Sequence, residues 1–135
     1  MSERSAWRVL RRSVFIGYGL ALFVATHWPA LTIPGEGRKD LIIHVGAFAV
    51  WASALIACGF FGLPFSRRNI LVCGVVAVAY AAIDEGSQAI PWVRRTAAWD
   101  DYAADVSGIA LAVGVALIVA AARRAACTPI SSEPE

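Results

Sequence analysis

The chain has 135 residues, of which 59% are apolar, and its mean hydropathy is +0.63. A chain of this length forms one compact unit, and a soluble fold could not cover so much apolar surface with so little polar surface. The net charge of +2 is too small to indicate a nucleic-acid partner, and we expect none. The composition therefore predicts an integral membrane protein.

The cysteines indicate neither a disulfide framework nor a zinc site. Cys58, Cys73 and Cys127 are odd in number and have no CxxC spacing. Cys58 and Cys73 lie in apolar runs, and we interpret them as packing residues. No cofactor and no metal site is expected from the sequence.

Arginines in residues 1–12 precede the first apolar run, as in a secretory signal. No convincing small-residue cleavage site follows, and Trp28-Pro29 closes the run, so we expect a retained first span. A membrane-spanning helix needs about 20 mostly apolar residues. The runs of sufficient length are 13–31, 41–63, 69–90 and 102–122.

The predicted fold class is all-α, an integral membrane bundle of four transmembrane helices with short loops. Residues 13–122 form the membrane domain, 1–12 a basic cytoplasmic N-terminus and 123–135 a short cytoplasmic tail. Continuous apolar runs and loops of about 5 to 11 residues exclude a barrel and favour antiparallel neighbours.

The placement of basic residues predicts the orientation. Eight arginines fall on one side of the membrane and four basic residues on the other, which favours both termini in the cytoplasm of a multi-pass cell (plasma or inner) membrane protein. The first group is Arg4, Arg8, Arg11, Arg12, Arg67, Arg68, Arg123 and Arg124, and the second is Arg38, Lys39, Arg94 and Arg95.

Polar residues in three of the spans fall at the outer side of the predicted bundle. An ionisable side chain within a span is costly unless it faces a partner or water. Each of the three helices carries a pair at a spacing of three or four residues, which places both members on one helical face. The pairs are Asp40 with His44, Glu85 with Gln88, and Asp101 with Asp105. We expect them at one level of the bundle, facing its axis.

Neighbouring residues have other interpretations. Asp84 points roughly 100° away from Glu85 around the helix, so one of the two is expected to face water or a loop. We interpret His27, beside Trp28, as an interfacial, solvated histidine and Ser87 as a helix-to-helix hydrogen bonder. Glycines in the last two spans, Gly74, Gly86, Gly108 and Gly114, are typical of close helix packing.

Three motifs in this order resemble the VanZ-like membrane proteins. They are DLIIHVGAF at 40–48, DEGSQAIPWVRR at 84–95 and RTAAWDDYAADVSGIALAVG at 95–114. The chain departs from the family pattern at Leu41, where the family has a basic residue, at Asp105, where it has Asn, and at Ala112, where it has a final glycine. Asp105 adds a carboxyl beside Glu85 and Asp101, which demands protonation of one acid or a cationic partner.

The resemblance implies a role at the outer face of the membrane. The family has no firmly established reaction, and its namesake is associated with antibiotic resistance, as lowered sensitivity to the lipophilic glycopeptide teicoplanin. We expect this chain to bind or modulate a lipid head group, a lipid-linked cell-envelope precursor or a lipophilic glycopeptide antibiotic. The expected ligand-binding residues are Asp40, His44, Glu85, Gln88, Arg94, Arg95, Asp101 and Asp105.

Two alternatives stay open at this stage. One is a membrane hydrolase or transferase in which His44 acts as acid or base with Glu85 or Asp101. The other is a structural or ion- and proton-handling protein whose buried polar groups join helices. The sequence does not decide between these alternatives, and it does not indicate an oligomeric state.

Overall fold

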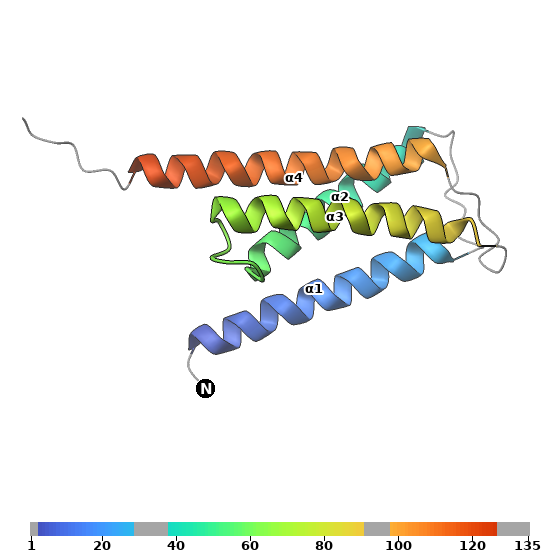
Figure 1. Ribbon diagram of the computed structural model, residues 1–135. Coiled ribbons are helices and arrows are strands. Elements are labelled where there is room, and N and C mark those ends of the chain that lie inside the picture. The colour runs from blue at the N-terminus through green and yellow to red at the C-terminus, as the bar shows by residue number, and fades with distance from the viewer. Residues whose placement is uncertain (1–2, 29–37, 91–97, 127–135) are drawn as a thin grey trace, which may run out of the picture.

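The structure, a computed structural model, describes residues 3–28, 38–90 and 98–126. These residues form four α-helices and no strand, in agreement with the predicted all-α class (Figure 1). The helices are α1 (Glu3–His27), α2 (Arg38–Cys58), α3 (Arg67–Gln88) and α4 (Trp99–Ala126). Each is long and apolar enough to cross a membrane.

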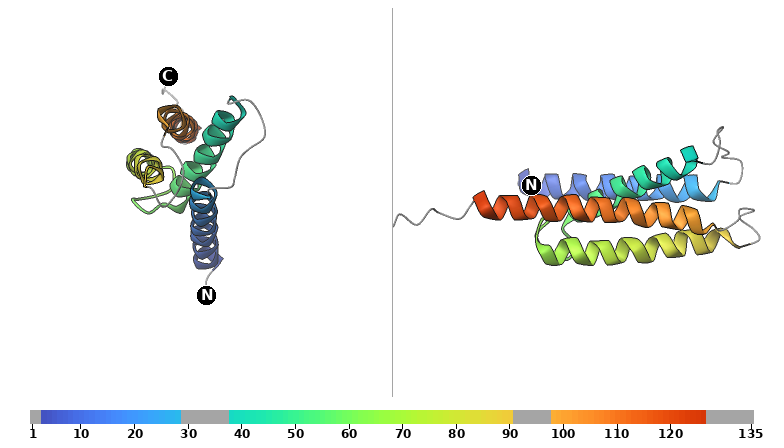
Figure 2. Two further views of the ribbon diagram at one scale, coloured as in Figure 1. Left: turned by 90° about the vertical axis from the view of Figure 1, so that its right-hand side faces the viewer. Right: turned by 90° about the horizontal axis from the view of Figure 1, so that it is seen from above.

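Helix α2 crosses the bundle obliquely and lies between α1 and the other two helices (Figure 2). Its most extensive contact is with α4, which also packs on α3, whereas α1 packs mainly on α2. Successive helices run in opposite directions. The last turns of α1 and α3 therefore lie at the same end as the first turns of α2 and α4, and we call this the polar end. We call the opposite end the arginine end.

The apolar core lies where α2, α3 and α4 meet. Phe48, Trp51 and Ile70 are buried there, and Trp51 stacks on Tyr80 with ring centroids 4.6 Å apart. Small residues let the backbones approach. The closest approach is at Gly108, where an added Cβ would lie 2.2 Å from the carbonyl oxygen of Val45. Helices α2 and α4 are therefore in direct backbone contact about two turns from the polar end.

The other glycines of this set do not all pack closely. An added Cβ at Gly74 would lie 3.0 Å from Val113 Cγ2, but at Gly86 and Gly114 it would meet nothing within 4 Å. The interpretation of these glycines as packing residues is therefore confirmed at Gly108 and Gly74 and is wrong at Gly86 and Gly114.

Two helix boundaries differ from the prediction. Helix α1 begins at Glu3, ten residues before the expected start, because the arginine-rich segment contains no helix breaker. Helix α2 ends at Cys58, before the expected Leu63, because Gly59 adopts a left-handed backbone conformation with φ of 63°. The proline expected to stop this helix, Pro64, lies in the turn that follows.

Asn69, which the sequence does not single out, holds that turn together. Its side chain is fully buried. The amide nitrogen donates to the carbonyl oxygens of Ile56 (2.9 Å) and Pro64 (2.8 Å), and the amide oxygen accepts from the backbone N–H of Phe61 (3.1 Å). Ser66 caps α3 by accepting from the backbone N–H of Asn69 at 3.3 Å. The bonds fix the connection between α2 and α3 at the arginine end.

Candidate ligand-binding site at the polar end

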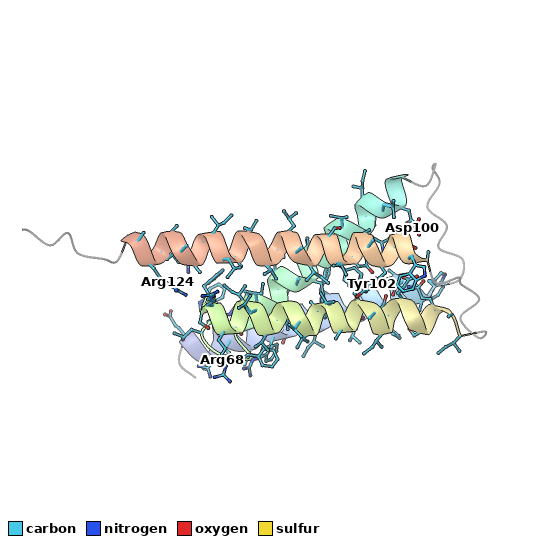
Figure 3. All side chains as sticks on the ribbon, turned by 45° about the horizontal axis from the view of Figure 1, so that its top comes forward. Arg68, Asp100, Tyr102 and Arg124 are labelled. Carbon is cyan, nitrogen blue, oxygen red and sulfur yellow. The ribbon has the colours of Figure 1, made fainter. Side chains whose placement is uncertain are left out.

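The structure places all described members of the predicted site at the polar end. Asp40 and His44 lie in the first turns of α2, Glu85 and Gln88 in the last turn of α3, and Asp101 and Asp105 in the first turns of α4. Figure 3 shows the separation along the bundle, with Asp100 and Tyr102 at this end and Arg68 and Arg124 at the other. Arg94 and Arg95 lie outside the described residues.

One group of these residues joins α2 to α4. His44 Nδ1 donates to Asp105 Oδ1 at 2.8 Å, and the side chain of Asp105 is only 1% exposed. Asp40 and Asp101 lie on the solvent side of this pair. One ring nitrogen of His44 and one carboxylate oxygen of each of these two acids lie within 4.8 Å of one another. Among the described residues, Asp40, His44 and Asp101 are the side chains that lie close enough together to hold a metal ion.

A second group joins the end of α3 to the start of α4. Glu85 Oε1 accepts from the backbone N–H of Ala98, and Oε2 accepts from Gln88 Nε2 at 3.3 Å. Both bonds fix the carboxylate, which is buried together with the amide of Gln88. Glu85 thus faces Ala98, the described loop residue before α4, as expected for one of the two adjacent acids.

A pocket of about 380 Å³ opens beside this second group. Its walls are almost wholly apolar and aromatic, and Glu85 is the single carboxylate that lines it among the described residues. The lining residues are Ala82, Glu85, Gly86, Ala98, Trp99 and Tyr102. Small ligands generally bind in concave, mostly apolar sites with a few placed polar groups.

A third group, which the sequence does not predict, joins α1 to α3. Thr26 donates to Asp84 Oδ1 at 3.2 Å, and His27 Nε2 lies 2.8 Å from Ser87 Oγ. The interpretation of Ser87 as a helix-to-helix hydrogen bonder is confirmed. The interpretation of His27 as a solvated residue is wrong, because its side chain is only 14% exposed and bonds across the helix interface. The sequence alone did not reveal this contact, because a solvated histidine at the membrane interface would also lie beside a tryptophan at the end of a span.

This third group contains the residue types of a Ser-His-Asp triad, in Ser87, His27 and Asp84, but it lacks the hydrogen bonds of a triad. Ser87 Oγ donates to the backbone carbonyl of Asp84 at 2.7 Å, and His27 Nδ1 donates to the carbonyl of Phe23 at 2.9 Å. His27 Nδ1 is 3.8 Å from Asp84 Oδ1, with Thr26 between them. In a working triad the acid accepts directly from the histidine and the hydroxyl donates to it. The arrangement is therefore a clamp between α1 and α3.

The polar end is acidic throughout the part whose side chains are described. It carries six carboxylates and two histidines, with no described Arg or Lys side chain among them. The carboxylates are those of Asp40, Asp84, Glu85, Asp100, Asp101 and Asp105. Asp84 is 3% exposed, and its Oδ2 has no hydrogen-bond partner in this part of the chain. Such a surface favours cations, ammonium groups and hydrogen-bond donors.

The described members of the predicted site lie at one end of the bundle, and their hydrogen bonds divide them between the first two groups. His44 and Glu85, predicted to act together, hydrogen-bond within different groups, because α4 presents Asp105 to α2 while its preceding residue, Ala98, binds Glu85. Comparison of the chain with protein-family models, with curated proteins and with solved structures finds no match.

Proposed function

We propose that this protein is a multi-pass membrane protein that binds the head group of an amphiphile at the outer membrane face. The amphiphile is a membrane lipid, a lipid-linked cell-envelope precursor or a lipophilic glycopeptide antibiotic. The observation that carries the proposal is the pocket beside Glu85. It combines apolar walls with one fixed carboxylate, and it lies at the end of α3 and α4, two helices long enough to span a membrane.

The walls of the pocket suit the apolar part of such a ligand. Trp99 and Tyr102, two of the lining residues, are of the aromatic type enriched where membrane helices meet water. A volume of about 380 Å³ is within the usual range for small-molecule sites. An acyl or prenyl chain would continue from it along the exposed apolar surface of α3 and α4.

Glu85 suits the polar part. An ionised carboxylate accepts about four hydrogen bonds, and Glu85 receives one from Ala98 and one from Gln88. Its remaining capacity faces the pocket that it lines. The chemistry favours a hydroxyl, amide or ammonium group of the ligand at this point. A phosphate or carboxylate of the same ligand would require the basic residues Arg94 and Arg95, and that contact remains a prediction.

The orientation of the protein is part of the proposal. The arginines whose side chains are described lie at the arginine end. By the excess of basic residues this end faces the cytoplasm, so that the polar end faces outward. The resemblance to VanZ-like proteins agrees with this placement. The alternative is a hydrolase or transferase that uses His44 with Glu85 or Asp101. His44 and Glu85 are hydrogen-bonded in different groups, whereas His44 and Asp101 have ligand atoms within 4.8 Å of each other, so the second pairing stays a prediction.

The pocket is tested by filling it. An added Cβ at Gly86 meets nothing within 4 Å, so Gly86→Leu fits the backbone and places a side chain in the pocket. Gly17→Leu is the matched control, since Gly17 on α1 has equally open surroundings. Glu85→Gln removes the charge while it keeps the hydrogen-bond acceptor.

The measurement is native mass spectrometry of the purified protein with phosphatidylethanolamine, phosphatidylglycerol, a polyprenyl-pyrophosphate precursor and a lipophilic glycopeptide. We expect at least one of these ligands to be retained by the wild type and by Gly17→Leu. Loss of a charge-assisted hydrogen bond lowers affinity by about 10- to 100-fold in Glu85→Gln, and Gly86→Leu should abolish retention. Unchanged retention by both pocket variants would refute the proposal.

A further inference from the structure

Three potential metal ligands converge at the solvent side of the α2–α4 contact. Asp40 and His44 are four residues apart on α2 and share a helical face. Asp101, in the first turn of α4, meets them from across the interface. One ligand atom of each lies within 4.8 Å of the other two, and all three residues are partly exposed, so an ion can reach them from water.

A fourth residue outside this set fixes the histidine. Asp105 is almost fully buried and accepts from His44 Nδ1 at 2.8 Å. Because an ionised carboxylate only accepts, Nδ1 carries a proton, and in the neutral imidazole Nε2 keeps the lone pair that can bind an ion. In the described part of the chain Nε2 has no hydrogen-bond partner. Histidines that bind metals almost always donate their other ring N–H to a carboxylate or carbonyl in this way.

From this arrangement we propose that Asp40, His44 and Asp101 bind one divalent transition-metal ion, with Asp105 as the positioning residue for His44. The ligand set, one imidazole nitrogen and two carboxylate oxygens, suits Zn²⁺ or Mn²⁺ better than Ca²⁺ or Mg²⁺, which prefer oxygen ligands alone. The two carboxylates balance the charge of the ion.

The fit requires only small movements. Ligand atoms around a tetrahedral ion at about 2.1 Å are roughly 3.4 Å apart, so the present spacing of up to 4.8 Å contracts by up to about 1.4 Å on binding. Rotation of Asp40 and Asp101 side chains at two helix starts supplies this. Three protein ligands leave a fourth position open for water or for an oxygen of a bound molecule. The site is distinct from the pocket beside Glu85, which none of the three residues lines.

The site is tested by metal binding to the purified, chelator-treated protein in detergent. Isothermal titration with Zn²⁺, Mn²⁺, Mg²⁺ and Ca²⁺ gives the affinities, and equilibrium dialysis with elemental analysis gives the stoichiometry. We expect one equivalent of Zn²⁺ or Mn²⁺ and weaker binding of Mg²⁺ and Ca²⁺. Cobalt substitution should give a visible d–d absorption band that is lost in His44→Gln.

The variants distinguish the effect of losing a metal ligand from the effect of losing a nearby charge. Asp40→Asn and His44→Gln should lower affinity by at least tenfold. Asp105→Leu should lower it by about 10- to 100-fold, and Asp105→Asn by less, because the amide oxygen still accepts from Nδ1. Asp100→Asn, an exposed neighbouring acid, and His27→Gln are matched controls that should bind as the wild type does.

Three results would overturn the proposal. They are the absence of stoichiometric binding, wild-type affinity in both Asp40→Asn and His44→Gln, and an equal loss in the two controls. Thermal unfolding of each variant without metal shows whether a loss reflects the site or the fold, and Asp40→Asn, at a partly exposed helix start, is the variant least able to disturb the fold. Because amphiphile binding is measured on the pocket variants, failure of one proposal leaves the other intact.

Discussion

Replacement of Gly108 by alanine should separate α2 from α4 and disrupt the site that they share. The added Cβ would lie 2.2 Å from the carbonyl oxygen of Val45 and 3.0 Å from the amide nitrogen of Ala49, whereas ordinary contacts begin near 3.4 Å. The obstacles are backbone atoms of a packed helix, which cannot rotate away as a side chain can. The helices would therefore move apart by about 1 Å at this point.

The expected cost follows from that movement. Overpacking of a close-packed interior generally costs about 1–3 kcal/mol, and alanine recovers at most about 1 kcal/mol through its higher helix propensity. We therefore expect the free energy of unfolding to fall by about 1–2 kcal/mol. The same movement lengthens the hydrogen bond of 2.8 Å between His44 and Asp105, which joins the same two helices one turn away. Metal affinity at the proposed site should fall with it.

The assay is reversible unfolding in mixed micelles by titration with dodecyl sulfate, followed by circular dichroism. Gly114→Ala is the matched control, because Gly114 lies on the same helix and an added Cβ there meets nothing within 4 Å. We expect the control to unfold as the wild type does or to be more stable by up to about 1 kcal/mol. If Gly108→Ala proves as stable as Gly114→Ala, α2 and α4 are not in backbone contact, and the reasoning is refuted.

Other expected outcomes concern buried polar groups, measured by the same unfolding titration. Asn69→Ala removes three hydrogen bonds to backbone groups and should cost about 3 kcal/mol; a loss below about 1 kcal/mol would contradict the role of this side chain in the turn. Thr26→Val removes the donor to Asp84 Oδ1 and should destabilise the protein by about 1–3 kcal/mol. Asp84→Asn should be at least as stable as the wild type, because it replaces a buried carboxylate whose second oxygen has no partner in the described residues; a large loss would mean that the charge is needed.

Hydropathy and proline positions predict the helices to within a few residues where strong signals coincide. The third predicted span, 69–90, matches α3 at Arg67–Gln88, and the fourth, 102–122, lies within α4 at Trp99–Ala126. Hydropathy measures the apolar length and not the helical length, so it misses the arginine-rich first turns of α1. It also misses the end of α2, because that end depends on the backbone conformation of Gly59.

Helical spacing predicts which polar residues share a face, but it cannot identify the neighbour that each face meets. Asp84 and Glu85 diverge by roughly 100°, as the sequence indicates. Only the position of α3 shows that the first faces α1 and the second the start of α4. The contribution of α1 was missed for the same reason, since only the position of α1 against α3 shows that Thr26 meets Asp84 and that His27 meets Ser87.

The division into groups also answers the question raised by the carboxyl of Asp105. Crowding with Glu85 and Asp101 was expected to require a cationic partner or protonation. The structure supplies a hydrogen-bond donor in His44 from a different helix, and this donor is a cation only when its imidazole is protonated. An asparagine at this position would accept the same hydrogen bond without adding charge. A carboxylate at position 105 is therefore expected to stabilise the site more than an asparagine only when the imidazole of His44 carries positive charge. That charge is either a second proton or a metal ion bound to the other ring nitrogen. A metal ion held by Asp40, His44 and Asp101 is such a charge, and the difference in affinity between Asp105→Asn and Asp105→Leu measures how much of the effect is charge and how much is orientation.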